Sequence, residues 1–203
     1  MAEETGEYVL VISDGSQLKS TWGYTGPGQA VYPNGEIFEG QYLDGKKSGN
    51  GTYTYSNGDK YIGAYVNDLK EGIGRMTYNE KGEYYGYFKK GKRDGEGVFK
   101  YTNGDIYSGQ WKDGKKEGKG TYIVKESGVK MVGFWADGKM MKGKWIFPNG
   151  SFYEGQFDHN QPKGNGTWKF ANGNLVSGEY VQTILPSEDE EKLDITLSWA
   201  SRR

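Results

Sequence analysis

His159 is the only histidine of this 203-residue chain, which has no cysteine. A zinc site needs several His or Cys ligands, and a nucleophilic serine needs a partnered histidine. His159 lies within Asp158-His159-Asn160, a segment rich in turn-forming residues. We therefore predict a loop residue rather than a general base, and we expect no catalytic residue, no cofactor-binding residue and no metal ligand.

Two other residue types recur at fixed spacing. Aspartates follow an aromatic position at Asp44, Asp113, Asp137 and Asp158. A pair of carboxylates is the machinery of glycosidases, but recurrence along the chain favours turn chemistry, in which Asp bonds to nearby backbone. Gly-x-Gly pairs such as Gly118 with Gly120 lack the third glycine of a dinucleotide fingerprint and open no Gly-Lys-Ser/Thr helix. They indicate loop closure and close approach of strands.

These residues belong to a repeat, of which Tyr107–Tyr122 is one copy. Its first glycine, Gly109, has counterparts 22 to 24 residues apart along the chain. The matching glycines are Gly40, Gly63, Gly86, Gly109, Gly133, Gly155 and Gly178. Such a period is the signature of a repeat architecture, and these seven are called anchor glycines from here on.

Alternation within the repeat predicts strands. Apolar residues occupy every second position, as at Tyr61, Gly63 and Tyr65. Asn57-Gly58 is a strong hairpin signal, because both residue types tolerate positive φ. We expect an all-β fold, an elongated single antiparallel sheet: a meander of about seven 23-residue β-hairpin repeats. The hairpin register stays open by one residue, and a slip of one would exchange the two faces.

The chain divides into three parts on this interpretation. Residues 1–21 are an N-terminal segment with a possible capping strand near Tyr8 to Ile12, residues 22–181 form the repeat array, and residues 182–203 are an acidic linker and a C-terminal segment. In the last part, Leu193 to Trp199 alternates apolar and polar residues and is expected to dock as a strand.

An aromatic residue stands two positions after each anchor glycine. The set is Tyr42, Tyr65, Phe88, Trp111, Trp135, Phe157 and Tyr180. As core, these rings would cover glycines of neighbouring strands, an arrangement known as aromatic rescue. As surface, they would bind a partner, because a single sheet cannot cover both of its own faces. We keep both interpretations and name these seven as candidate partner-binding residues.

Charge and composition narrow the function classes. Lysines cluster in the loops inside repeats, as at Lys46 and Lys92, and acidic residues such as Glu36 and Asp105 cluster in the turns between repeats. We expect one basic and one acidic edge. The net charge is −1, with 26 Lys and Arg against 27 Asp and Glu, which disfavours nucleic acid as a partner. The N-terminus has no secretory pattern, so we expect a soluble, intracellular protein.

The pattern Tyr-x-Gly-x-Trp-x-x-Gly-Lys-x-x-Gly-x-Gly at Tyr107–Gly120 resembles the MORN repeat, over residues 22–181. Three departures from the repeat are similar to the radial-spoke-head members of that family: an extra residue at Glu126-Ser127-Gly128, an irregular copy at residues 160–166, and an acidic stretch after Tyr180 followed by a late Trp.

The resemblance implies a non-enzymatic scaffold of the ciliary or flagellar axoneme, located in the cytoplasm and cytoskeleton and supporting motility. Its implied partners are other spoke-head subunits, a second MORN protein or itself, with no cofactor and no nucleic acid, and membrane contact is not favoured. The alternative is a membrane- or phosphoinositide-binding tethering module, since clustered Lys attract anionic lipids. An accessory domain of an enzyme is a third, weaker possibility.

Overall fold

The computed structural model describes residues 7–185 and 194–202, which form seventeen β-strands and no helix. The strands are β1 (Val9–Ile12), β2 (Gln17–Leu18), β3 (Gly26–Val31), β4 (Ile37–Leu43), β5 (Lys46–Thr54), β6 (Lys60–Val66), β7 (Leu69–Tyr78), β8 (Gly82–Lys89), β9 (Lys92–Tyr101), β10 (Ile106–Lys112), β11 (Lys115–Ile123), β12 (Lys130–Ala136), β13 (Lys139–Ile146), β14 (Phe152–Asp158), β15 (Gln161–Lys169), β16 (Leu175–Leu185) and β17 (Asp194–Ser201). All belong to one antiparallel sheet, so the all-β meander is confirmed. A search of the described residues for a membrane-spanning helix found none.

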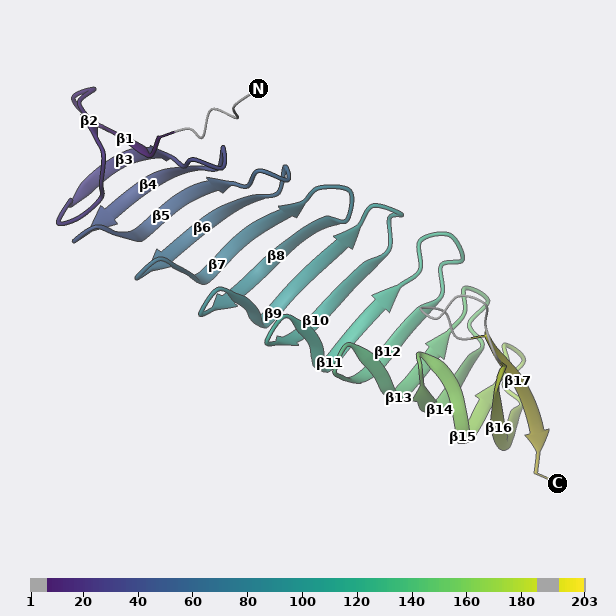
Figure 1. Cartoon of the computed structure of the whole chain (residues 1–203). Helices are drawn as coiled ribbons and strands as arrows, with labels where there is room; N and C mark the ends of the chain where they lie inside the picture. Colours follow the sequence, from purple (N-terminus) through teal and green to yellow (C-terminus); the bar gives the residue numbers. More distant parts are fainter. Residues whose placement is uncertain (1–6, 186–193, 203) are drawn as a thin grey trace, which may run out of the picture. The chain divides into compact units, whose positions relative to one another are not determined.

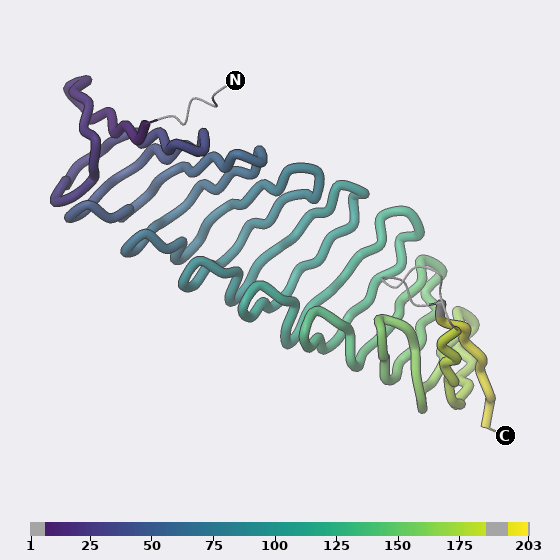
Figure 2. Tube along the Cα trace, viewed as in Figure 1, coloured from purple at the N-terminus to yellow at the C-terminus, as the bar shows by residue number. Residues whose placement is uncertain are grey.

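The chain forms two compact units, with a boundary inside β10. Unit 1 comprises Met1–Thr102 and Trp111–Gly114, and unit 2 comprises Asn103–Gln110 and Lys115–Arg203. In unit 1 the strands from β3 to β9 pair in chain order, and β1 pairs with both β2 and β3. In unit 2 the strands from β11 to β17 pair in chain order (Figure 1). Figure 2 shows the chain reversing direction at each turn. The three domain boundaries expected from sequence stay predictions.

A row of glycines fixes the register that the sequence left open. In unit 1, Gly40 pairs with Gly51, Gly63 with Gly74, and so on across the strands. The full row is Gly28, Gly40, Gly51, Gly63, Gly74, Gly86 and Gly97. The second glycine of each Gly-x-Gly pair lies in this row. The first, such as Gly72 with φ 69°, lies at a bulge of the hairpin, where a positive φ favours glycine. The first glycine of each pair therefore allows the bulge of the hairpin, and the second allows the strands to approach closely.

The turns are of two kinds, which corrects the expectation for Asn-Gly. Inside repeats, two-residue turns have positive φ at both positions, as at Asp113 (49°) and Gly114 (86°), the geometry of a type I′ hairpin. Between repeats, Asn57 has no positive φ. Only Gly58 does, at 85°, and its N–H donates to the carbonyl of Tyr55 at 3.0 Å. Asn-Gly thus marks a three-residue loop with glycine in the left-handed position.

The ends of the sheet follow the sequence expectations in part. The strand expected near Tyr8 to Ile12 is β1, which pairs with β2, a strand of two residues, and with β3. The strand expected at Leu193 to Trp199 is β17, which pairs with β16. Leu193 itself and the acidic linker at residues 186–191 lie outside the described residues.

Candidate interaction surfaces

Alternation along each strand gives the sheet two unlike faces. We call the side that carries the anchor glycines and their flanking rings the first face, and the opposite side the second face. In β8, Tyr84, Gly86 and Phe88 are buried on the first face, whereas Tyr85 and Tyr87 are exposed on the second. The two faces therefore offer different chemistry to a partner.

Rings of successive repeats form a continuous ladder on the first face of unit 1. Each ring two residues before an anchor glycine contacts the ring two residues after it, and also the corresponding ring of the next repeat. Tyr61 meets Tyr65 at 5.3 Å between ring centroids and Phe88 at 5.0 Å, with interplanar angles of 87° and 82°. Edge-to-face pairs of this kind are favourable beyond the area they bury. The ladder thereby joins one repeat to the next.

The ring over each glycine pair covers the anchor glycine of its own strand as well as the glycine of the neighbouring strand, whereas the sequence suggested neighbouring strands alone. Tyr61 lies across Gly63, two residues later in β6, and Gly74 of β7; a Cβ on either glycine would overlap it. Its hydroxyl continues over the pair and donates to the carbonyl of Ala64 at 3.1 Å. Tyr84 makes the same bond to Tyr87 at 3.0 Å. Glycine is therefore required beneath each ring.

A cation lies over the rings of most repeats. The residue seven positions after the anchor glycine is Lys47, Lys70, Arg93 or Lys116. Each lies half-buried against aromatic faces of its own repeat and of a neighbouring one. Lys70 Nζ is 5.3 Å from the Tyr61 ring centroid and 5.8 Å from that of Phe88, and it donates to the Tyr55 hydroxyl at 3.1 Å. Desolvation by burial lowers the pKa of Lys70. These cations are part of the packing rather than solvated edge charges.

Two repeats of unit 2 replace the cation by an apolar side chain. The equivalent positions are Met140 and Pro162, both fully buried. The backbone N–H of Met140 donates to Asn160 Oδ1 at 2.9 Å, as that of Lys47 donates to Asp68 Oδ1. We call the position seven residues after the anchor glycine the plug position. It is buried or half-buried in the first six repeats, and an apolar side chain can replace the cation there.

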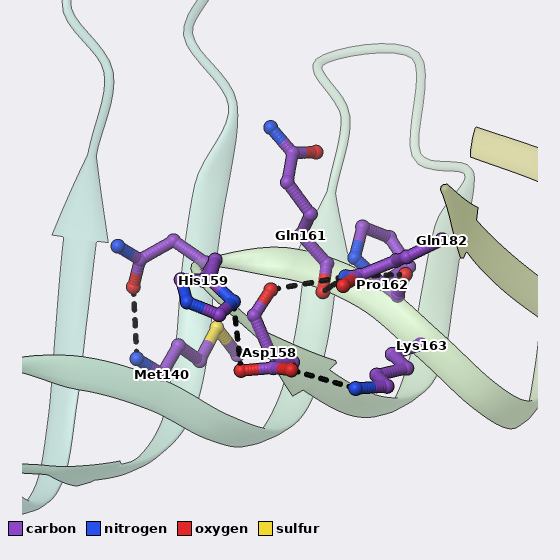
Figure 3. A network of polar contacts seen from close by, with 8 residues as sticks. Met140, Asp158, His159, Gln161, Pro162, Lys163 and Gln182 are labelled. Carbon is purple, nitrogen blue, oxygen red and sulfur yellow. Dashed lines mark hydrogen bonds and ion pairs between the residues drawn. The ribbon is translucent and has the colours of Figure 1, made fainter. Parts of the chain in front are cut away.

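Gln182 takes the place of a missing turn after the sixth repeat (Figure 3). In the first four repeats an N–H of the next turn donates to the carbonyl of the residue at the plug position, as Gly91 does to Lys70 at 2.9 Å. The seventh repeat has no such turn because β16 continues. The amide nitrogen of Gln182 instead lies 3.0, 3.0 and 3.1 Å from the carbonyl oxygens of Asp158, Gln161 and Pro162.

The seven candidate partner-binding rings all lie on the first face. Six are 3–4% exposed: Tyr42, Tyr65, Phe88, Trp111, Trp135 and Phe157. The seventh, Tyr180, is half-buried and packs on Trp199 at 4.9 Å. Within the chain these rings are core, and burial leaves them little surface for a partner. Partner contact through them stays a prediction.

Burial sets the ionisation of the tyrosines. Desolvation raises the pKa of Tyr55 and of Tyr153 to about 12, and it raises the pKa of Tyr42 and of Tyr65 further still. These hydroxyls therefore remain neutral near pH 7 and add no charge to the first face.

The second face of unit 1 carries an apolar surface that the sequence analysis did not single out. Seven large side chains there are 40–53% exposed: Ile62, Val66, Leu69, Ile73, Tyr85, Tyr87 and Val98. We call them the β6–β9 patch. The segment Tyr84–Phe88 indicates it in sequence, because aromatic residues stand at both odd and even positions around Gly86 and so must lie on both faces of the strand. Both faces of β8 had to be apolar, whichever register held.

The edge formed by the turns inside repeats is mixed in charge, which corrects the expected basic edge. Asp113 accepts from Lys92 at 3.1 Å, Asp94 pairs with Lys112 at 3.1 Å, and Asp137 pairs with Lys115. The hydrogen bond from Lys92 lowers the pKa of Asp113. Asp113 and Asp137 thus supply turn backbone and pair with lysines. Asp158 pairs with Lys163 and also accepts a backbone hydrogen bond from His159, the nearby-backbone contact expected of the recurring aspartates.

Acidic residues between repeats connect successive turns. Asp59 Oδ1 accepts the N–H of Asn79 at 2.7 Å, and Asp105 Oδ1 accepts that of Lys125 at 2.8 Å. These carboxylates are engaged within the chain, so the expected acidic edge is only partly available to an external cation.

His159 has the role expected of it. It is the first residue of the last two-residue turn, with φ 49°, and its Nδ1 lies 3.0 Å from Asp158 Oδ1. A search of the described residues for groups of three or more His, Cys, Asp or Glu suited to a metal ion found none.

Comparison with known proteins identifies the repeat. The model of the MORN repeat family matches residues 38–60, 61–82, 84–106, 107–123, 132–152 and 153–175. These segments cover more than half of the chain, which therefore belongs to the MORN-repeat family. The hairpin of β16 and β17, which contains the seventh anchor glycine, lies almost wholly beyond them. A comparison with curated protein sequences gave no match.

Solved structures share the fold at low identity. The SAS-4 (dCPAP) TCP domain of Drosophila melanogaster, in complex with a proline-rich motif of Ana2 (dSTIL), has a TM-score of 0.50 and 17% identity over 87% of this chain and 92% of that one. The TCP10 domain of Danio rerio CPAP, in complex with a STIL peptide, has a TM-score of 0.35 and 16% identity over 87% and 96%. The first likeness concerns the fold alone.

Proposed function

We propose that this chain is a non-enzymatic scaffold subunit of the axonemal radial spoke head, in the cilium or flagellum. It would hold neighbouring subunits at fixed positions through protein–protein contacts along its sheet. The observation that carries the proposal is the contrast between the two faces. The first packs the repeats into rigid units, and the second leaves apolar side chains for another protein.

The spoke-head assignment rests on the three departures from the repeat. One of them has a clear structural form. The turn between β11 and β12 is one residue longer than the others, because Gly128 donates to the carbonyl of Val124 at 2.9 Å, four residues back, whereas Gly58 donates to Tyr55, three back. The irregular sixth copy coincides with the plug residue Pro162 and the Gln182 bonds. Membership of a non-catalytic repeat family supports a structural role.

A tagged copy in a ciliated cell tests the assignment. After removal of the membrane with mild detergent, we expect the tag to remain along the axoneme and to be lost from axonemes of a spoke-head mutant. Release with the detergent-soluble membrane fraction would sink the spoke-head proposal. Retention that is indifferent to the spoke-head mutation would place the chain elsewhere in the axoneme.

A membrane-tethering module is the second candidate, and Trp22 favours it. This side chain is 93% exposed in the loop before β3, beside the Asp44-Gly45 turn, where the Gly45 N–H donates to Tyr24 at 2.8 Å. Exposed Trp is typical of membrane–water interfaces. Against it, Lys92 and Lys112 on the same edge are paired with carboxylates.

Vesicle flotation separates the two candidates. A tether should bind vesicles containing phosphatidylserine, lose binding as salt rises, and weaken on Trp22→Ala. We expect a scaffold to stay with the unbound fraction at physiological salt, with or without Trp22.

A further inference from the structure

The β6–β9 patch is a contiguous surface. In register, Ile73 lies directly opposite Tyr87 across β7 and β8, and Tyr85 lies opposite Val98 across β8 and β9. Ile62 stands one strand further along the same face, opposite Arg75. Side chains directly opposite each other on one face are in contact range. The apolar groups therefore form one area over four strands rather than scattered single residues.

The size of the patch matches a protein interface. Half-exposed side chains of this kind expose several hundred Å² together, at the upper end of the roughly 300–600 Å² found on soluble monomers. A standard interface buries about 800 Å² on each partner, with an apolar centre and a polar rim. The patch and its charged neighbours are close to this scale.

Charged side chains on the same face surround the patch with both signs. At the end nearest the turns between repeats they are Lys60, Arg75, Glu83 and Lys100. Toward the end nearest the turns inside repeats they are Glu71, Lys89, Lys92, Asp94 and Glu96. One end is thus net positive and the other net negative. A partner of a single sign would meet like charge at one of them.

A second copy of the same face satisfies this pattern. A two-fold axis lying in the interface and perpendicular to the strands reverses the strand direction of the second copy, so its positive end lies over the negative end of the first. Each contact is then made twice, as in any isologous interface. The apolar centres face each other at about 10 Å, the spacing of packed sheets.

We propose that the second face of β6–β9 is the contact surface for a second copy of this chain, with strands of the two copies running in opposite directions. The inference rests on the proposed protein-binding role and gives it a named surface and partner. It adds the second layer that a single sheet needs to cover its apolar face.

Sedimentation equilibrium on the purified full chain tests the proposal. We expect the wild type to have twice the monomer mass at micromolar concentration. Ile73→Glu places a carboxylate in the centre of the interface on both copies and should weaken dimerisation at least about 100-fold. Gln41→Glu, an equally exposed change on the second face of β4 outside the patch, should leave the dimer intact. A wild type that stays monomeric, or a dimer indifferent to Ile73→Glu, overturns the proposal.

Single cysteines locate the contact even if the charged variant folds poorly. The chain has no cysteine, so Ile73→Cys and Gln41→Cys each introduce one thiol. A short bis-maleimide should link copies of Ile73→Cys and not of Gln41→Cys. The reverse result would place the contact elsewhere and overturn the inference. Dimerisation in solution is independent of axonemal retention, so the failure of the spoke-head assignment and of this inference are distinguishable.

Discussion

The guanidinium carbon of Arg93 lies 4.3 Å from the centroid of the Trp111 ring. Arg93 Nη2 also reaches the carbonyl of Gly114 at 2.5 Å, while the N–H of Gly114 donates to the carbonyl of Arg93 at 2.9 Å. One side chain thus joins the ring ladder to the turn of the following repeat. Arginine suits this site because it stacks on rings and keeps its fork of donors free for a carbonyl.

Arg93→Ala should lower the free energy of unfolding by about 2–3 kcal/mol, because it removes the cation over the rings and leaves the Gly114 carbonyl without its donor. Arg93→Lys should cost less, since the ammonium of Lys70 fills the same position one repeat earlier. Urea unfolding followed by Trp fluorescence measures both.

Lys92→Ala is the matched control for Arg93. The side chain of Lys92, next to Arg93 in sequence, is 61% exposed and pairs with Asp113 at 3.1 Å. An exposed ion pair of this kind is worth about 0–1 kcal/mol. Equal losses of unfolding free energy for Lys92→Ala and Arg93→Ala would mean that Arg93 stabilises the fold no more than an exposed charge at the edge of the sheet.

Tyr61 and Gly74 should be energetically coupled. Tyr61→Ala removes a fully buried ring and should cost about 3–5 kcal/mol. Gly74→Ala forces a Cβ against that ring and should cost about 1–3 kcal/mol. In the double variant the Cβ enters the space that the ring has left. The loss of unfolding free energy in the double variant should therefore be smaller than the sum of the two single losses by about 1 kcal/mol or more.

Additive losses in this double-mutant cycle would contradict the packing of Tyr61 across the glycine row. Gly15→Ala serves as the control for glycine removal as such: the position has a φ of 85°, and a Cβ there meets nothing within 4 Å. Its cost should therefore report backbone strain alone, and it should not depend on Tyr61.

The ladder of rings follows closely from sequence. The spacing of Tyr61, Gly63 and Tyr65 predicted strands, a shared face and glycine beneath aromatic rings, because period two and the absence of a side chain leave few alternatives. The turns were harder. Asp113-Gly114 and Asn57-Gly58 both suit positive φ, and only the pairing of strands decides which forms the two-residue turn.

The cations and the second face were beyond local pattern. Lys46 and Lys70 look alike in sequence, yet they stand six and seven residues after their anchor glycines. Lys70 therefore lies on the rings, whereas Lys46 is exposed. The spacing correctly placed the seven candidate binding rings on one face. It did not predict their burial, because that depends on ring contacts between repeats. Tyr85 stands one residue before its anchor glycine, a position where the other repeats have no aromatic residue, so the repeat pattern does not indicate it.

Alkaline pH should destabilise the fold between pH 10 and about 12. Unfolded tyrosines ionise near pH 10, whereas burial raises the pKa of Tyr55 and Tyr153 to about 12. In this window the folded state holds more protons than the unfolded state, so the free energy of unfolding falls as pH rises. Urea titrations at pH 8, 10 and 11.5 should give decreasing midpoints.

Tyr153→Phe isolates one contributor to this slope. The Tyr153 hydroxyl is buried and has no hydrogen-bond partner among the described residues, so its removal should leave stability at pH 8 unchanged or slightly higher. Above pH 10 the variant should lose stability less steeply than the wild type. An identical slope would mean that Tyr153 is not protonated in the folded state there.

At pH 7, Gln182→Glu should be more damaging than Gln182→Ala, and the order of the two costs should reverse at pH 4. The amide nitrogen faces three carbonyl oxygens within 3.1 Å, where a carboxylate would meet only acceptors. Gln182→Ala leaves those carbonyls without a hydrogen-bond donor and should cost about 1–3 kcal/mol.

In Gln182→Glu the folded-state pKa of the new carboxyl is raised, so its protonated form can still donate below the unfolded value near pH 4.3. That contribution is lost as pH rises. The difference in unfolding free energy between Gln182→Glu and Gln182→Ala should therefore favour Glu at pH 4 and Ala at pH 7. The same order at both pH values would contradict the donor role of Gln182.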